Sequence, residues 1–122
     1  MKKFLCLLIL ITIIPLIKSR SSQKLWGNTS LKQLQQQNEC FGCDLSFSDM
    51  SKNDLSGINL RQARLDFVNF AESDLSGADL SETSLKNAYL VKAWISGTDL
   101  NGCDATGANF HDADLSGSTF IN

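Results

Sequence analysis

Apolar side chains recur at every fifth residue from position 45 to position 120, and this spacing constrains the fold more than any other feature of the chain. A second row, two residues before the first, is made almost entirely of small residues: thirteen of its sixteen members are Ala, Ser, Thr or Cys. The apolar row has a single small member, Ala105, and consists of Leu45, Met50, Leu55, Leu60, Leu65, Phe70, Leu75, Leu80, Leu85, Leu90, Ile95, Leu100, Ala105, Phe110, Leu115 and Phe120.

A period of five residues fits neither an α-helix, which repeats near 3.6 residues, nor a β-strand, which repeats at two. On a helix, steps of five would advance by about 140° and scatter the apolar residues around the axis. The inward residues are instead separated alternately by two and by three positions. A step of two residues matches the alternation of side chains in a β-strand. A step of three would turn the next inward side chain outward, so the chain must bend there to keep it inside. Each pentapeptide is therefore predicted to form one short extended face followed by a bend.

A second period of 20 residues indicates how many faces complete one turn of the coil. Glycine adopts a positive φ at a corner without steric cost, so a recurring Ser-Gly pair predicts an edge that always turns the same way. The pairs are Ser56-Gly57, Ser76-Gly77, Ser96-Gly97 and Ser116-Gly117. Four pentapeptides per coil predict a square cross-section with four coils, roughly 41–60, 61–80, 81–100 and 101–120. At ~4.8 Å per coil the rod would be about 20 Å long.

The small row follows from the narrowness of this square, which has no room for eight large side chains per coil. Four Leu or Phe residues fill the centre, and the small residues fill the space beside them. Each buried Leu or Phe contributes about 1.5–3 kcal/mol. Ala105 is expected to leave a local deficit above Leu85 in the same column.

Several segments resemble the A-(D/N)-L-x-x signature of the pentapeptide-repeat family: Asp54-Leu55-Ser56-Gly57, Ala78-Asp79-Leu80-Ser81, Ala108-Asn109-Phe110 and Ala113-Asp114-Leu115-Ser116-Gly117. The resemblance covers residues 41–120 and implies an all-β fold, a right-handed quadrilateral parallel β-helix. Most members of the family have no assigned activity. The preceding segment, residues 31–45, is similar to a leader seen in cyanobacterial members. Three departures from the signature, Arg64, Tyr89 and Trp94, fall on outward positions.

The N-terminal part is predicted to contain a targeting segment and a cap. Lys2-Lys3 and the apolar residues 4–17 are typical of a signal peptide over residues 1–21, or of an uncleaved membrane anchor. Cleavage is expected after Ser21 or, alternatively, after Ser19. Residues 22–40 form a linker with a capping helix that starts after Ser30, before the repeats of residues 41–122. We therefore expect export to a periplasm, a thylakoid lumen or the medium, with membrane contact only through residues 4–17 if these are uncleaved.

The charge distribution bears on the partner class. From Glu39 onward there are 13 acidic residues and 5 basic ones, a net charge of −8. An acidic rod repels nucleic acid and favours a basic protein partner. The expected partner-binding side chains are the outward aromatic residues Tyr89, Trp94, Phe47 and Phe67, although Phe47 could instead be covered by the leader. We expect the charged column Lys52, Glu72, Lys92 and Asp112 to form a ladder of alternating sign.

Reactive side chains are few. Cys40 and Cys43 either form a disulfide or pack as two thiols, and Cys103 is expected to be buried. A zinc site lacks a second ligand pair, and the outward Asp54, Asp74 and Asp114 are expected to bond nearby turns rather than a cation. His111, the sole histidine, has no nucleophile arranged around it, so no catalytic residue, metal or cofactor is predicted.

Two function classes remain. The first is a non-catalytic exported scaffold or protein-interaction module. The alternative is an inhibitor that resembles the DNA-mimicking, topoisomerase-binding members of the family, which the acidic rod suits. The last coil is expected to expose core at Phe120 and Ile121 and to form a homodimer there.

Overall fold

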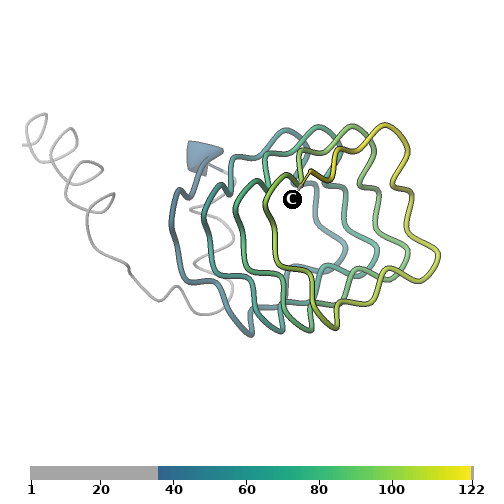
Figure 1. The fold of residues 1–122 in the computed structure, drawn as a ribbon, viewed down its shortest axis with the longest axis horizontal. Coiled ribbons are helices and arrows are strands. Elements are labelled where there is room, and N and C mark those ends of the chain that lie inside the picture. Colours follow the sequence, from purple (N-terminus) through teal and green to yellow (C-terminus); the bar gives the residue numbers. More distant parts are fainter. Residues whose placement is uncertain (1–35, 122) are drawn as a thin grey trace, which may run out of the picture.

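The computed structural model describes residues 36–121. In this part of the chain the backbone winds into a rod with a four-sided cross-section (Figure 1). Thirteen parallel bridges each join a residue to the one 20 positions later, from Glu39↔Asn59 to Asp99↔Thr119. Twenty residues therefore complete one coil, which confirms the repeating coil expected from the sequence.

Each side of the square is one bridge wide, because the chain bends every five residues. The described residues accordingly contain isolated bridges and no longer strand. Hydrogen bonds run in both directions along the rod at each bridge: Leu75 N donates to Trp94 O at 2.7 Å, and Asp74 N donates to Asn53 O at 2.9 Å. Backbone hydrogen bonds thus hold the coils together, and these bonds repeat regardless of which outward side chain is present.

The described chain begins with two helical residues, Gln36 and Gln37. The expected capping helix starts after Ser30 and lies outside the described residues except for these two, so it stays a prediction. The expected signal peptide or anchor over residues 1–21 also lies outside them.

The Ser-Gly edge turns the same way in every coil, as expected, but the other three edges turn that way too. All sixteen pentapeptides place the residue two positions after the apolar row at a positive φ, and nine of these residues are not glycine. A hydrogen bond closes these turns, as in Ile58 N to Leu55 O at 3.2 Å, which is the pattern of a type II turn. The four edges therefore turn alike. A side chain at such a corner meets no neighbour, since a Cβ added at Gly57 or Gly77 would find nothing within 4 Å, and only the cost of the left-handed φ itself remains.

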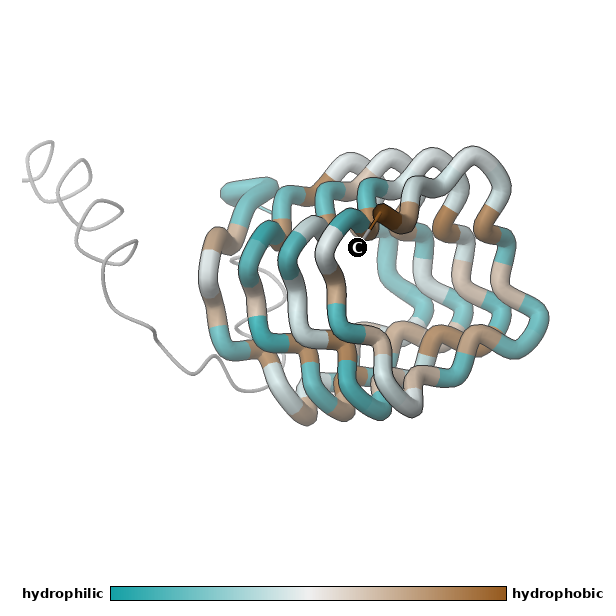
Figure 2. The backbone as a smooth tube through the Cα atoms, viewed as in Figure 1, coloured by the Kyte–Doolittle hydropathy of each residue, from teal (hydrophilic) through white to brown (hydrophobic). Residues whose placement is uncertain are grey.

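The apolar row forms the core in files along the rod, and Figure 2 shows hydrophobic positions aligned from coil to coil. Members from Leu45 to Leu100 are at most 2% exposed. Small-row hydroxyls inside the rod are satisfied by carbonyls, as in Thr98 Oγ1 to Leu75 O at 2.7 Å. In the last coil Phe110 and Leu115 are only half-buried, and so is Ala105. Ala105, where the sequence predicts that the core is underfilled, therefore lies at the open end of the described core.

Candidate functional site

The outward side chains are arranged on four faces, which we name by their bridge residues. Face 1 carries Asp44, Arg64, Ser84 and Asp104; face 2 carries Asp49, Asn69, Tyr89 and Asn109; face 3 carries Asp54, Asp74, Trp94 and Asp114; face 4 carries Asn59, Asp79, Asp99 and Thr119. Neighbours within a face come from successive coils, about 4.8 Å apart. Any site on this rod is therefore built from a column of residues spaced by 20.

Asp and Asn at the bridge positions stabilise the turn that follows them. The side-chain oxygen accepts a hydrogen bond from the backbone amide two residues later, as in Asp54 Oδ1 with Ser56 N at 3.1 Å and Asn69 Oδ1 with Ala71 N at 3.1 Å. Short polar side chains favour this local bond. We call this contact the amide cap. It is formed by Asp44, Asp49, Asp54, Asn59, Asn69, Asp74, Asp79, Asp99, Asp104, Asn109 and Asp114.

The amide caps keep several carboxylates ionised. Hydrogen bonds from the side chain and then the backbone of Ser56 lower the pKa of Asp54, and the same two contacts from Thr106 together with Lys86 lower the pKa of Asp104 to about 2. The pKa of Asp114 is lowered chiefly by the amide of Ser116. The expectation that the acidic column bonds nearby turns is therefore met at the capping positions of face 3.

Arg64, Tyr89 and Trp94 cannot form the amide cap because their side chains offer no suitable acceptor. The amides two residues later, on Asp66, Val91 and Ser96, have no acceptor within the described part of the chain. Arg64 is compensated by ion pairs with Asp44 at 3.6 Å and with Asp66 at 3.5 Å.

Ser84 is compensated differently, since Asp66 of the preceding coil accepts from Lys86 N at 3.3 Å. For Tyr89 and Trp94, no side-chain hydrogen bond or ion pair is formed with residues 36–121. These two positions therefore lose a local interaction without a replacement.

The four expected aromatic residues are exposed: Phe47 64%, Phe67 51%, Tyr89 58% and Trp94 54%. Phe47 and Phe67 lie one coil apart at the edge between faces 1 and 2, with parallel rings whose centroids are 5.0 Å apart. Both hold a positive φ, which is unfavourable for a bulky side chain. Tyr89 and Trp94 belong to the same coil but to neighbouring faces, 2 and 3.

Phe41, at 59% exposure, is a further outward aromatic residue that the sequence analysis did not identify. Its register, one position after Cys40 in the apolar lattice, could have indicated it.

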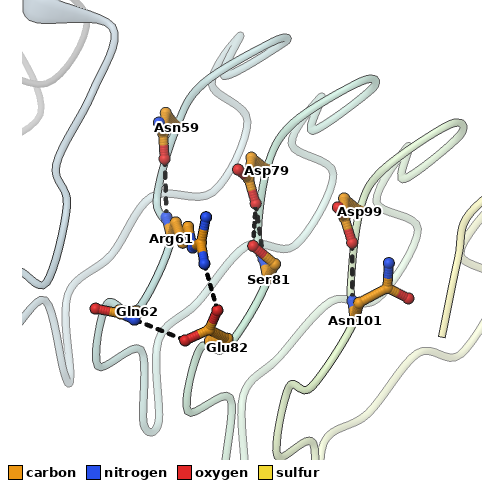
Figure 3. Close-up of polar contacts among 8 residues, drawn as sticks. All are labelled: Asn59, Arg61, Gln62, Asp79, Ser81, Glu82, Asp99 and Asn101. Carbon is orange, nitrogen blue, oxygen red and sulfur yellow. Dashed lines mark hydrogen bonds and ion pairs between the residues drawn. The ribbon is translucent and has the colours of Figure 1, made fainter. Parts of the chain in front are cut away.

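Ion pairs occupy faces 1 and 4 and the edge between faces 2 and 3. Arg61 pairs with Glu82 at 2.5 Å, Lys86 pairs with Asp104 at 3.1 Å, and Lys52 lies 4.0 Å from Glu72. Figure 3 shows Glu82 held by Arg61 and by Gln62, whose amide donates at 2.6 Å. Of the expected alternating ladder only Lys52–Glu72 is within ion-pair distance, because long side chains at solvent-facing corners gain little from pairing.

Cys40 and Cys43 form a disulfide across the first described turn, with their Cα atoms 5.5 Å apart. Cys43 N also donates to Cys40 O at 3.3 Å, so the bridge and the backbone bond close the same turn. Cys103, expected to be buried, is only half-buried because it lies in the open last coil, and burial raises the pKa of its thiol.

His111 pairs with Asp112 at 3.5 Å on the surface, where both side chains are more than half exposed. Within residues 36–121, no three His, Cys, Asp or Glu side chains gather in a way that could hold a metal ion. The same residues include no helix that is long and apolar enough to span a bilayer. Phe120 and Ile121 are 52% and 69% exposed at the last coil.

The solved structures that resemble this chain include two with more than 30% sequence identity and a TM-score above 0.6. One is a pentapeptide-repeat protein involved in heterocyst differentiation regulation from the cyanobacterium Nostoc sp. strain PCC 7120, with 36% identity and a TM-score of 0.63 over 66% of this chain and 37% of that one. The other comes from the Arabidopsis thaliana thylakoid lumen, with 31% identity and a TM-score of 0.66 over 66% of this chain and 56% of that one. The chain thus spans between about a third and just over half of the length of these proteins.

A search of curated protein sequences found no match. The family model of pentapeptide repeats matches residues 40–82, 63–102 and 83–120, which together cover the described coils. Proteins of that family form right-handed quadrilateral β-helices, in agreement with the four-sided rod and its bridges 20 residues apart. The chain therefore belongs to the pentapeptide-repeat family.

Proposed function

We propose that this protein is a non-catalytic, exported interaction module that binds a protein partner through its exposed aromatic residues. The observation that carries the proposal is the loss of the amide cap at Tyr89 and Trp94, where an exposed ring replaces a residue that would stabilise the turn. Natural sequences break a local rule in this way mostly at functional positions. The stacked and exposed rings of Phe47 and Phe67 supply a second outward aromatic pair.

A binding role suits the rod better than catalysis. The outward side chains of one face run parallel to each other and the faces point apart, so groups do not converge on a reacting atom. Many carboxylates already accept hydrogen bonds from backbone amides, and within residues 36–121 the imidazole of His111 has Asp112 as its one ion-pair partner. We infer that the protein needs no catalytic residue, metal or cofactor.

Export is supported by three independent features. The leader of residues 1–21 has the charge and hydropathy pattern of a signal peptide. The Cys40–Cys43 disulfide suits an oxidising compartment. A structurally similar protein is found in the thylakoid lumen of a plant. If the leader stays uncleaved, residues 4–17 would instead anchor the rod to a membrane.

The test is affinity capture from native extract with the wild-type rod and with a Tyr89→Asn/Trp94→Asn variant. Asparagine restores the amide cap, as it does at Asn69 and Asn109, so the variant keeps the fold while losing both rings. Ser84→Asn is the matched control, because it changes the same lattice position on face 1. Loss of the captured protein only in the double variant supports the proposal. Equal capture by all three proteins refutes it.

A second candidate, a DNA-mimicking inhibitor that binds a topoisomerase, is favoured by the acidic column of face 3, which has no base in ion-pair distance among residues 36–121. It requires a cytosolic protein. Cell fractionation followed by a supercoiling assay distinguishes the two: a cytosolic protein that inhibits supercoiling would favour the inhibitor.

We also propose that two copies associate end to end at the last coil. Leu100 is 1% exposed, whereas Phe120 in the same file is 52% exposed, so the apolar file continues to the open end. A second copy would cover Phe120 and Ile121 and pair the free backbone groups of that coil.

A further inference from the structure

Face 3 has one edge of short residues and one edge of charged residues. The first edge carries Ser56, Ser76, Ser96 and Ser116 with the corner glycines Gly57, Gly77, Gly97 and Gly117, and the second carries Lys52, Glu72, Lys92 and Asp112. A Cβ added at Gly97, three residues from Trp94, would meet nothing within 4 Å, so no side chain overhangs this corner. A partner can therefore approach the indole ring from the glycine edge without displacing part of the rod.

The backbone holds Trp94 between two carboxylates. Bridges join Asp74 to Trp94 and Trp94 to Asp114, which places one carboxylate on either side of the ring at about 4.8 Å along the rod. Hydrogen bonds on both sides keep this register: Leu75 N donates to Trp94 O at 2.7 Å, and Ile95 N donates to Asp114 O at 2.7 Å. The backbone positions of the two aspartates and of Trp94 are thus fixed before any partner binds.

The Asp74 carboxylate keeps one oxygen for a ligand. Oδ1 of Asp74 and Oδ1 of Asp114 each accept from a serine amide at 2.9 Å, and Oδ2 of Asp74 has no partner among residues 36–121, whereas the side chain of Ser116 also donates to the Asp114 carboxylate. Four of the five bases of the rod are paired elsewhere, with Glu72, Glu82, Asp44, Asp66 and Asp104. The fifth base, Lys92, lies two residues before Trp94 at the edge between faces 2 and 3 and forms no ion pair with residues 36–121. No base of the described rod is therefore within ion-pair distance of Asp74 or Asp114.

We propose that Trp94, Asp74 and Asp114 bind an arginine side chain of the partner, a proposal that rests on the interaction function above. An indole face attracts a cation, and a guanidinium is flat, weakly hydrated and able to stack on the ring. Its outward N–H groups would donate to Oδ2 of a flanking carboxylate, and the second carboxylate adds to the negative potential. The charge complementarity of the face selects this occupant over an apolar one, which would leave both carboxylates desolvated and unpaired.

The probe is a fluorescein-labelled peptide, Gly-Arg-Gly-Arg-Gly, whose binding to the rod is followed by fluorescence anisotropy at low salt. The matched control peptide carries citrulline, which keeps the shape of arginine without its charge. We expect the arginine peptide to bind about three- to tenfold more tightly than the citrulline peptide and than an equivalent lysine peptide. Equal binding of the arginine and citrulline peptides overturns the proposal, and tighter binding of the lysine peptide overturns the choice of arginine.

Variants locate the site on the rod. Trp94→Asn and the double variant Asp74→Asn/Asp114→Asn both keep an amide cap, and each is expected to weaken the arginine peptide by about threefold or more. Asp54→Asn, in the same column but two coils from Trp94, is the control and should change affinity by less than about twofold. If Asp54→Asn weakens binding as much as the double variant, the affinity for the peptide depends only on net charge and the proposed site is wrong.

The peptide experiment tests the arginine site and the capture experiment tests the interaction function, so either proposal can be refuted without the other. If the captured partner is lost with Trp94→Asn but retained by the Asp74→Asn/Asp114→Asn variant, the interaction function stands and the arginine site is wrong. If the Trp94→Asn variant captures the partner as well as wild type but no longer binds the arginine peptide, the proposed function is wrong and the cation site stands.

Discussion

The amide cap can be tested at Asp79, where one carboxylate oxygen serves two donors. Asp79 Oδ1 accepts from Ser81 N at 3.0 Å and from Ser81 Oγ, and Ser81 is only 9% exposed. Asp79→Ala leaves both donors without this acceptor. Unsatisfied buried donors cost about 1–3 kcal/mol, so the variant should lose roughly that much free energy of unfolding.

The matched variant is Asp79→Asn, which keeps the side-chain oxygen and removes only the charge. It should cost less than about 1 kcal/mol, because asparagine already forms the cap at Asn59 in the preceding coil. For a domain of this size each kcal/mol corresponds to about 4–8 °C, so Asp79→Ala should melt roughly 4–24 °C below wild type. Circular dichroism melting at neutral pH measures the difference.

Thr119→Ala serves as the control, since Thr119 occupies the same lattice position without an amide cap and should change stability by less than about 0.5 kcal/mol. Two results would refute the reasoning. Either Asp79→Ala melts like wild type, or Asp79→Asn is destabilised as strongly as Asp79→Ala.

Four further predictions concern acid, the disulfide, the last coil and dimerisation. The folded pKa of Asp104 is about 2, below its ordinary 3.8, so its contribution is present above pH 3.8 and lost as pH falls toward 2; acid titration of the melting temperature should show the decline, and a flat profile contradicts it. Cys40→Ser should lower stability by about 2 kcal/mol through the short loop that the bridge closes, and full alkylation of both cysteines before reduction would disprove the bridge. Ala105→Leu should raise the melting temperature by burying more apolar surface at a half-buried position of the core, whereas a fall would show that the site is already full. Phe120→Asp should convert an end-to-end dimer to monomer, and an unchanged sedimentation coefficient argues against that interface.

The coil itself was predictable because it depends on chain spacing alone. Inward side chains separated by two and three residues converge on one axis only if the chain bends at every pentapeptide, and the Ser-Gly period indicated four bends per coil. Residues 20 apart had to become neighbours, as Asp74 and Trp94 are. The outward register of Tyr89 and Trp94 followed from the same count.

Other features of the surface depend on tertiary contacts that spacing does not reveal. A left-handed corner is tolerated by Phe47 because its Cβ meets solvent, so the glycine column did not mark a distinct edge. Which acids are neutralised depends on side-chain reach between coils: Arg61 extends to Glu82 in the next coil, while Asp74 and Asp114 meet no base among the described residues.

The sequence by itself determined a four-sided coil, its register and the inward or outward direction of the side chains in the repeats, because a repeat of fixed length leaves the backbone one way to bury its apolar row. Only the tertiary structure decided how outward side chains interact: it set the parallel geometry of the Phe47 and Phe67 rings and showed the amide cap that Trp94 lacks. The physical reason is that backbone hydrogen bonds between coils repeat with the chain, whereas side-chain contacts depend on rotamers and on the particular residues that meet in each column.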